Sequence, residues 1–114
     1  MSFNELELKR IDRTVCDLCR RKTRPEHADQ LRFECDIDGH TVTIWGVRPP
    51  WDGVGDHTRM GVARFRYFRS RGVWILYWMR RDLKWQRYEP ASSTPDLAVL
   101  VAIVETDEYG AFFG

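Results

Sequence analysis

The chain of 114 residues is 43% hydrophobic and 31% charged, and its formal net charge is +1. These values are typical of a globular protein, and they exclude a disordered or repetitive chain. The length favours one domain over residues 1–114. Five Trp, four Tyr and six Phe can fill the core of that domain without a disulfide or a metal.

The sequence also bears on the compartment. Charged residues begin at Glu5, and the longest apolar runs, 73–79 and 97–104, are too short to span a bilayer. Three cysteines, an odd number, argue against a disulfide framework and for free thiols. We therefore expect a cytoplasmic protein with no membrane partner.

Charge is strongly segregated along the chain. Residues 9–24 carry seven basic and two acidic side chains, whereas residues 25–58 carry two basic and seven acidic ones. Residues 59–87 carry nine basic side chains and one acid, Asp82, and residues 88–114 are acidic again. Such an uneven field concerns the partners of a protein more than its fold.

A helix is predicted over residues 4–22. Asn4 is a good N-cap residue, and Glu5 and Glu7 suit the positive end of the helix dipole. Pro25 ends the helix. Apolar residues recur at helical spacing and form one stripe, made of Leu8, Ile11, Val15, Leu18 and Cys19.

Residues 31–37 and 40–47 predict a β-hairpin. Both runs alternate between apolar and polar residues, and Asp38-Gly39 is a favoured two-residue turn. This turn would place Cys35 opposite Val42 on an apolar face. The other face would carry Arg32, Glu34, Asp36, Thr41, Thr43 and Trp45.

Residues 48–59 are rich in Pro and Gly and are predicted to form a loop. Gly53-x-Gly55 resembles a phosphate-binding loop only superficially, because a strand and not a helix follows it. Asp52, Asp56 and His57 could form a catalytic cluster, but the sequence supplies no matched nucleophile. Turn formation explains these residues more simply. We predict no catalytic residue.

Three further strands are predicted at 60–69, 73–80 and 84–89, joined by short turns. Alternation along them assigns a core face and an opposite face. The core face would carry Ala63, Phe65, Tyr67, Trp74, Leu76, Trp78 and Trp85. The opposite face mixes arginine with aromatic residues and would carry Arg64, Arg66, Phe68, Ile75, Tyr77, Met79, Gln86 and Tyr88.

A second helix is predicted to start near 93–96, with Pro95 in its first turn, and to end before Gly110. Phe112 and Phe113 are too apolar to stay in water, so the C-terminal tail is expected to dock on the protein. The predicted fold is α+β in the order α-β-β-β-β-β-α. Short connections imply two layers, with a five-strand, mainly antiparallel sheet and the N-terminal and C-terminal helices on one face.

Three segments are distinctive: RPPWD (48–52), YWMRRDLKWQRYEP (77–90) and DEYGAFFG (107–114). They resemble the uncharacterised bacterial family called domain of unknown function 3024, and the resemblance covers nearly the whole chain. It implies a small bacterial domain that stands alone, with no established activity, cofactor or partner. In the family pattern His is common at the position of Gln86 and Cys at that of Ala111, so this chain would lack any chemistry that those residues serve.

Cys16-x-x-Cys19 is the candidate for metal or redox chemistry. Helical spacing would place both sulfurs on nearly one face, as in half of a zinc site, but no second ligand pair follows. A thioredoxin-like role needs the motif at the start of a helix after a strand. Packing of two small buried side chains is the third reading, and we predict no metal and no cofactor. His40, beside the hairpin turn, is predicted to be structural.

The arginine and aromatic side chains of the opposite face have three interpretations. Arginine stems can lie over aromatic rings with their charged ends in water, without any partner. The face can instead bury against another protein or a second copy of this chain. It can also bind single-stranded nucleic acid, with arginine on phosphates and aromatic rings stacked on bases.

We expect a non-enzymatic binding module, with nucleic acid as the first choice of partner and protein as the second. An enzyme of unknown class is the outside alternative. The nine basic residues between 59 and 87 are expected to form one positive region. The predicted nucleic-acid-binding residues are Arg64, Arg66, Arg69, Arg71, Tyr77, Arg80, Arg81 and Lys84.

Overall fold

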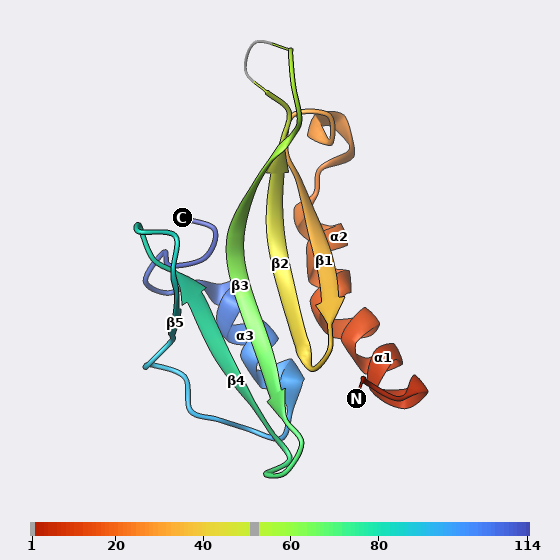
Figure 1. Ribbon diagram of the computed structural model, residues 1–114, viewed down its shortest axis with the longest axis vertical. Coiled ribbons are helices and arrows are strands. Elements are labelled where there is room, and N and C mark those ends of the chain that lie inside the picture. The colour runs from red at the N-terminus through yellow and green to blue at the C-terminus, as the bar shows by residue number, and fades with distance from the viewer. Residues whose placement is uncertain (1, 51–52) are drawn as a thin grey trace.

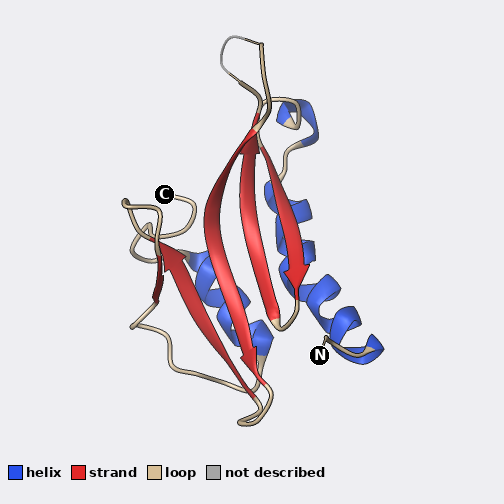
Figure 2. Cartoon of the chain, in the orientation of Figure 1, coloured by secondary structure: helices blue, strands red, loops and turns tan. Residues whose placement is uncertain are grey.

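The computed structural model describes residues 2–50 and 53–114. It has an N-terminal helix, a five-strand antiparallel sheet and a C-terminal helix, so the predicted α+β fold is confirmed. The strands lie across the sheet in chain order (Figure 1, Figure 2). They are β1 (Arg32–Asp38), β2 (Thr41–Arg48), β3 (Thr58–Phe68), β4 (Val73–Met79) and β5 (Trp85–Arg87).

The N-terminal helix has three parts, namely α1 (Glu5–Ile11), a π-helical turn η1 (Asp12–Cys16) and α2 (Asp17–Lys22). Asn4 and Glu7 form a capping box, in which each side chain accepts a hydrogen bond of 2.9 Å from the backbone N–H of the other. A short 3-10 helix, η2 (Pro25–His27), follows. The predicted apolar stripe is buried except at Leu8, which is 40% exposed.

The C-terminal helix, α3 (Leu97–Thr106), starts later than predicted. Asp96 is its N-cap and accepts a hydrogen bond from the backbone N–H of Ala98, so Pro95 lies before the helix. Asp107, with a φ of 48°, takes the left-handed position that was expected of Gly110. Aspartate tolerates this conformation. Its carboxylate also accepts hydrogen bonds from backbone N–H groups of the tail, and a glycine has no side chain to do so.

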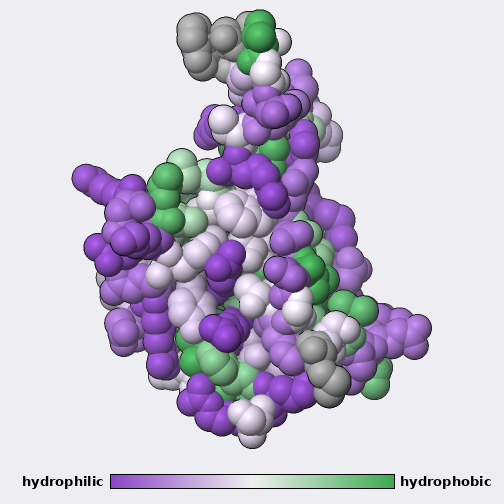
Figure 3. All heavy atoms as spheres, in the orientation of Figure 1, coloured by the Kyte–Doolittle hydropathy of each residue, from purple (hydrophilic) through white to green (hydrophobic). Residues whose placement is uncertain are grey.

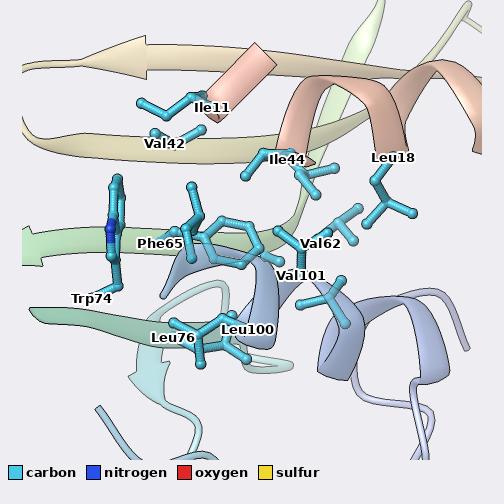
Figure 4. Close-up of a cluster of buried hydrophobic side chains, with 14 of the residues drawn as sticks. Ile11, Leu18, Val42, Ile44, Val62, Phe65, Trp74, Leu76, Leu100 and Val101 are labelled. Atoms are coloured by element: carbon cyan, nitrogen blue, oxygen red, sulfur yellow. The ribbon is translucent and has the colours of Figure 1, made fainter. Parts of the chain in front are cut away.

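Both helices cover the same face of the sheet, as predicted, and lie behind it in Figure 1. Figure 4 shows side chains from the N-terminal helix and α3 meeting those of the strands. We call this side of the sheet the covered face. Its fully buried side chains include Ile11, Val15, Leu18, Val42, Ile44, Phe65, Leu76, Leu100 and Val104. Among the described residues, no helix has the length and apolar character needed to cross a bilayer.

The C-terminal tail docks on the protein, as expected. Phe112 is 8% exposed, and its ring centroid lies 4.9 Å from that of Tyr88. Phe113 contacts Phe33 of β1 edge to face at 5.1 Å, and the Nζ atom of Lys22 lies 4.7 Å from its ring.

The predicted hairpin exists, but its register differs by two residues. The loop is Gly39-His40, so that Asp38 pairs with Thr41 and Cys35 with Ile44. Gly39 has a φ of 59°, as in hairpin turns with glycine in the first central position. A shift of two residues leaves every side chain on its predicted face, because the side-chain period of a strand is two.

The cysteines differ from the prediction. Cys16 of η1 and Cys35 of β1 form a disulfide, whose Cα atoms are 5.2 Å apart, and only Cys19 is a free, buried thiol. The expectation of free thiols throughout is therefore wrong. Three cysteines allow one disulfide and one free thiol. Alternation along β1 predicts Cys35 on the face that the helices cover, which is where Cys16 lies.

Candidate nucleic-acid interface

The face of the sheet that the helices leave uncovered is called the open face here. It faces the viewer in Figures 1 and 3, where hydrophilic side chains surround paler and apolar ones. β1 directs Arg32, Glu34, Asp36 and Asp38 to it, and Arg32 forms an ion pair with Glu34 at 2.8 Å. The side chains that β2 to β5 direct to the open face include Thr43, Trp45, Arg59, Arg64, Arg66, Phe68, Ile75, Tyr77, Met79, Trp85 and Arg87.

Two tryptophans occupy the centre of the open face. The ring centroids of Trp45 and Trp85 are 6.1 Å apart in an edge-to-face arrangement. A β-bulge between the Ile44 and Trp45 pairings leaves Val62 unpaired and places Gly61 opposite Trp45. The ring of Trp85 lies directly over Gly61, where a Cβ atom would come within 2.7 Å of it.

Two arginines of β3 lie over these rings. The guanidinium carbon of Arg59 is 4.6 Å from the Trp45 ring centroid, and that of Arg64 is 4.4 Å from Trp85. The Nε atom of Arg64 also donates a hydrogen bond of 3.1 Å to Thr43 Oγ1. Burial lowers the pKa of Arg64, although the nearby carboxylates of Asp36 and Asp38 oppose this effect. Since a guanidinium stays charged in proteins, Arg64 is a partly dehydrated cation held in place.

A shallow depression of about 190 Å³ lies beside this centre. Tyr77 lines it, and no aromatic contact is formed by the Tyr77 ring within the described part of the chain. The lining contains two cations and two aromatic rings but no carboxylate, and consists of Thr41, Arg64, Arg66, Tyr77 and Trp85. The depression therefore offers two half-buried aromatic rings next to positive charge.

Arg66 and one further predicted residue, Arg71, extend this surface toward the β3–β4 turn. The guanidinium carbons of Arg66 and Arg71 lie 5.0 and 4.9 Å from the ring centroid of Phe68. Both arginines are exposed. They have no carboxylate partner among residues 2–50 and 53–114.

Arg69 does not belong to the open face. Its guanidinium forms hydrogen bonds of 2.8 and 3.1 Å with the two carboxylate oxygens of Glu7, and it lies 5.2 Å from the ring of Tyr67 on the covered side. The same contact lowers the pKa of Glu7 and raises that of Arg69. Its charge is thus paired with Glu7 of the same chain, and the positive region is smaller than predicted.

The remaining predicted residues lie at the β4–β5 turn. Arg80 pairs with Asp82 at 3.6 Å. Arg81 and Lys84 are exposed, and their side chains have no partner in the described segments. These two are free cations at the edge of the open face.

Trp45 and Trp85 belong to the candidate site, but the sequence did not predict either of them as a site residue. Alternation predicts Trp85 on the core face, and this prediction is wrong, because Trp85 pairs with Met79 and shares the open face with it. Gln86 and Tyr88 consequently lie on the covered side, where Tyr88 is buried. The face of β5 follows from its pairing with β4 and not from alternation continued across the turn. Alternation had placed Trp45 on the open face, but it was not counted as a site residue.

The other candidate groups are not assembled into a site. Asp56 and His57 are exposed in the β2–β3 loop, and Asp52 lies outside the described residues. Cys16 is bonded to Cys35, and burial raises the pKa of the Cys19 thiol to about 12, so the motif offers no reactive thiolate at neutral pH. His40 is half-buried in the hairpin turn, with its ring 5.6 Å from that of Phe3. Within the described ranges, no three His, Cys, Asp or Glu side chains are grouped to hold a metal ion.

Gln86 and Ala111 line one depression of about 430 Å³ between β5 and the C-terminal tail. Comparisons with curated proteins and with solved structures found no match. A family model matches residues 3–114. The chain therefore belongs to the family described as a domain of unknown function, DUF3024.

Proposed function

We propose that the protein is a non-enzymatic module that binds single-stranded nucleic acid on its open face. The observation that carries the proposal is the depression lined by Arg64, Arg66, Tyr77 and Trp85. Tyr77 would stack on an unpaired base, while the arginines would bind flanking phosphates. Single strands are favoured over duplexes because an aromatic ring stacks on the face of a base, and in a duplex the neighbouring base pairs cover that face.

The cytoplasm is the proposed compartment, since nucleic acid is available there. The cytoplasm is reducing, so the Cys16–Cys35 disulfide would be exposed to reduction. Both cysteines lie on the covered side of the sheet. Binding on the open face should accordingly not depend on the disulfide, and a reductant should leave it unchanged.

Binding of a fluorescently labelled single-stranded DNA and RNA of mixed sequence tests the proposal. Tyr77→Ala should weaken binding by about 5- to 150-fold, the usual effect of losing one stacked base. Arg66→Gln should weaken it and also flatten its dependence on salt. Arg69→Gln is the matched control, because it removes the same charge from the covered side, where Glu7 already neutralises it.

Two outcomes would contradict the proposal. One is the absence of binding by the unmodified protein at low salt. The other is equal loss in Arg66→Gln and Arg69→Gln, which would indicate a nonspecific effect of net charge. Melting curves of all variants show whether each change acts on binding or on folding.

A second candidate function is self-association through the same face. The open face is acidic on β1, at Asp36 and Asp38, since Glu34 is paired with Arg32, and it is basic on β3 and β5. A copy related by a twofold axis would place its acidic half on the basic half of the first. Light scattering at high protein concentration decides between the two candidate functions. If the face binds nucleic acid, we expect a monomer. If it joins two copies, we expect a dimer that Tyr77→Glu dissociates.

A further inference from the structure

A cleft of about 360 Å³ lies on the helix side of the molecule, between the N-terminal helix and the start of α3. It is remote from the open face, and none of its lining residues belongs to the surface proposed to bind nucleic acid. A volume of this size falls in the range of small-molecule sites. Its walls come from α1, η1, β3, β4 and the first turn of α3.

The inner walls of the cleft are apolar and partly aromatic. Ile11 and Leu97 are buried side chains that line it, and Trp74 and Tyr67 form an aromatic wall with ring centroids 5.0 Å apart. Trp74 is held in place by Phe3, whose ring stacks on it with centroids 5.4 Å apart and an interplanar angle of 17°. The aromatic wall is therefore rigid before any ligand arrives.

The rim of the cleft carries both signs of charge, but only its cations are free. Glu7 is occupied by Arg69 and the backbone of Asn4, and Asp96 caps α3 through the Ala98 amide. Arg10 and Arg13 are exposed, and their guanidinium groups have no partner within the described residues. One turn apart on the helix, they can both reach one anionic group.

We propose that this cleft binds a small organic anion that has an aromatic body and one carboxylate or sulfonate group. The aromatic body would lie against Trp74 and Tyr67, and Arg10 and Arg13 would bind the anionic group. The π-helical turn Asp12–Cys16 forms part of the wall, through Arg13 and Thr14, and such turns are frequent at functional sites. The proposal is independent of nucleic-acid binding on the open face.

The probe for the test is 8-anilinonaphthalene-1-sulfonate, together with N-phenyl-1-naphthylamine, which has the same ring system without the sulfonate. The folded protein should bind one molecule of the sulfonate and prefer it to the neutral amine. Arg10→Gln/Arg13→Gln should lower the affinity for the sulfonate by about tenfold or more, the effect of losing charged hydrogen bonds, while the affinity for the amine changes little. Ala98→Trp, placed to fill the cleft from the first turn of α3, should abolish binding of both probes.

The open face also presents arginine and aromatic rings, so the test must separate the two surfaces. Trp85→Ala and Arg81→Gln alter only the open side and should leave binding of the sulfonate unchanged, whereas Ala98→Trp should leave nucleic-acid binding unchanged. Retention of the sulfonate by Ala98→Trp, or its loss in Trp85→Ala, would overturn the proposal. An equal loss of affinity for both probes in Arg10→Gln/Arg13→Gln would also overturn it, because it would show that the two arginines do not recognise the sulfonate group. Since Arg10 and Arg13 are exposed, this variant should fold even if Ala98→Trp does not.

Discussion

Gly61 permits the aromatic centre of the open face. It lies beside the β-bulge, opposite Trp45, and the space above its backbone is filled by Trp85 and by the methyl group of Met79. A side chain at position 61 would occupy the space of the Trp85 ring, over which the guanidinium group of Arg64 lies. Because residue 61 has no side chain, the Trp85 ring and the Arg64 guanidinium group can lie where they do.

Gly61→Ala is expected to destabilise the protein by about 1–3 kcal/mol, the usual cost of overpacking. The added Cβ would lie 2.6 Å from Met79 Cε and 2.7 Å from the Trp85 ring, so at least one of these side chains must move. Urea unfolding measures the loss of stability, and tryptophan fluorescence reports the displacement of the ring. Gly46→Ala is the control, because its Cβ would meet no atom closer than 3.5 Å. Equal effects of the two substitutions would show that the close approach of Trp85 is unimportant.

Among the elements, α3 is joined to the tail through a single residue. Asp107 ends the helix in a left-handed conformation, and its carboxylate accepts hydrogen bonds of 3.0, 2.7 and 3.1 Å from the backbone N–H groups of Phe112, Phe113 and Gly114. The tail then places Phe112 on Tyr88 and Phe113 on Phe33, which closes one end of the core.

Asp107→Asn should lower the free energy of unfolding by about 1–3 kcal/mol, because the charged acceptor of three amides is lost while the backbone preference is kept. The measurement is urea unfolding of this variant in the full chain and in a chain lacking residues 111–114. In the shortened chain the substitution should have little effect, since its partners are gone. An equal cost in both backgrounds would mean that Asp107 acts on the helix alone.

The disulfide joins the N-terminal helix to the edge strand β1 across a sequence separation of 19 residues. For a loop of this length, the chain-entropy model gives about 3 kcal/mol of stabilisation. Reduction should therefore lower the melting temperature, whereas Cys16→Ala/Cys35→Ala should melt at one temperature with or without reductant. Identical melting of the unmodified protein under both conditions would exclude a stabilising bond.

The ends of the N-terminal helix and the faces of β1, β2, β4 and the part of β3 after its bulge were predictable from the sequence, whereas β5 and the ends of α3 were not. Alternation fixes the face of a strand and tolerates a shift of two residues, so the incorrect hairpin register still turned Cys35 to the helices and Trp45 to the open face. The face of Trp85 depends on its pairing with Met79, and that pairing is set by the turn. The cap at Asp107 depends on amides of the tail, which only the folded chain brings together.

The same limit applies to the candidate site. The sequence indicated that arginine and aromatic side chains share one face, because both follow the two-residue period of β3 and β4. It could not indicate that Arg69 pairs with Glu7, since these residues are 62 positions apart and meet only when α1 packs beside the sheet. Charge counted along the chain consequently overestimated the positive surface.

Across the whole molecule, the decisive feature is the division of the open face into an acidic and a basic half. The carboxylates of Asp36 and Asp38 act on Arg64, so they lie within electrostatic reach of the proposed binding surface. A nucleic-acid strand would follow β3 to β5 and avoid β1, because the carboxylates repel phosphate. Four phosphate contacts would give a salt slope of about −2.8, so that affinity falls about 50-fold between roughly 50 and 200 mM salt.

The double variant Asp36→Asn/Asp38→Asn tests this division of the surface. It should raise the affinity for single-stranded DNA by about three- to tenfold at low salt, because two exposed repulsive charges are removed. The slope of the salt dependence should stay the same, since the number of phosphates bound does not change. If the open face instead joins two copies of the chain, the same substitutions remove the charges that attract the basic half of the partner. The dimer would then dissociate more readily in light scattering, and nucleic-acid binding would not improve. Nucleic-acid binding therefore predicts that Asp36→Asn/Asp38→Asn strengthens the complex with single-stranded DNA, whereas self-association predicts that it weakens the dimer.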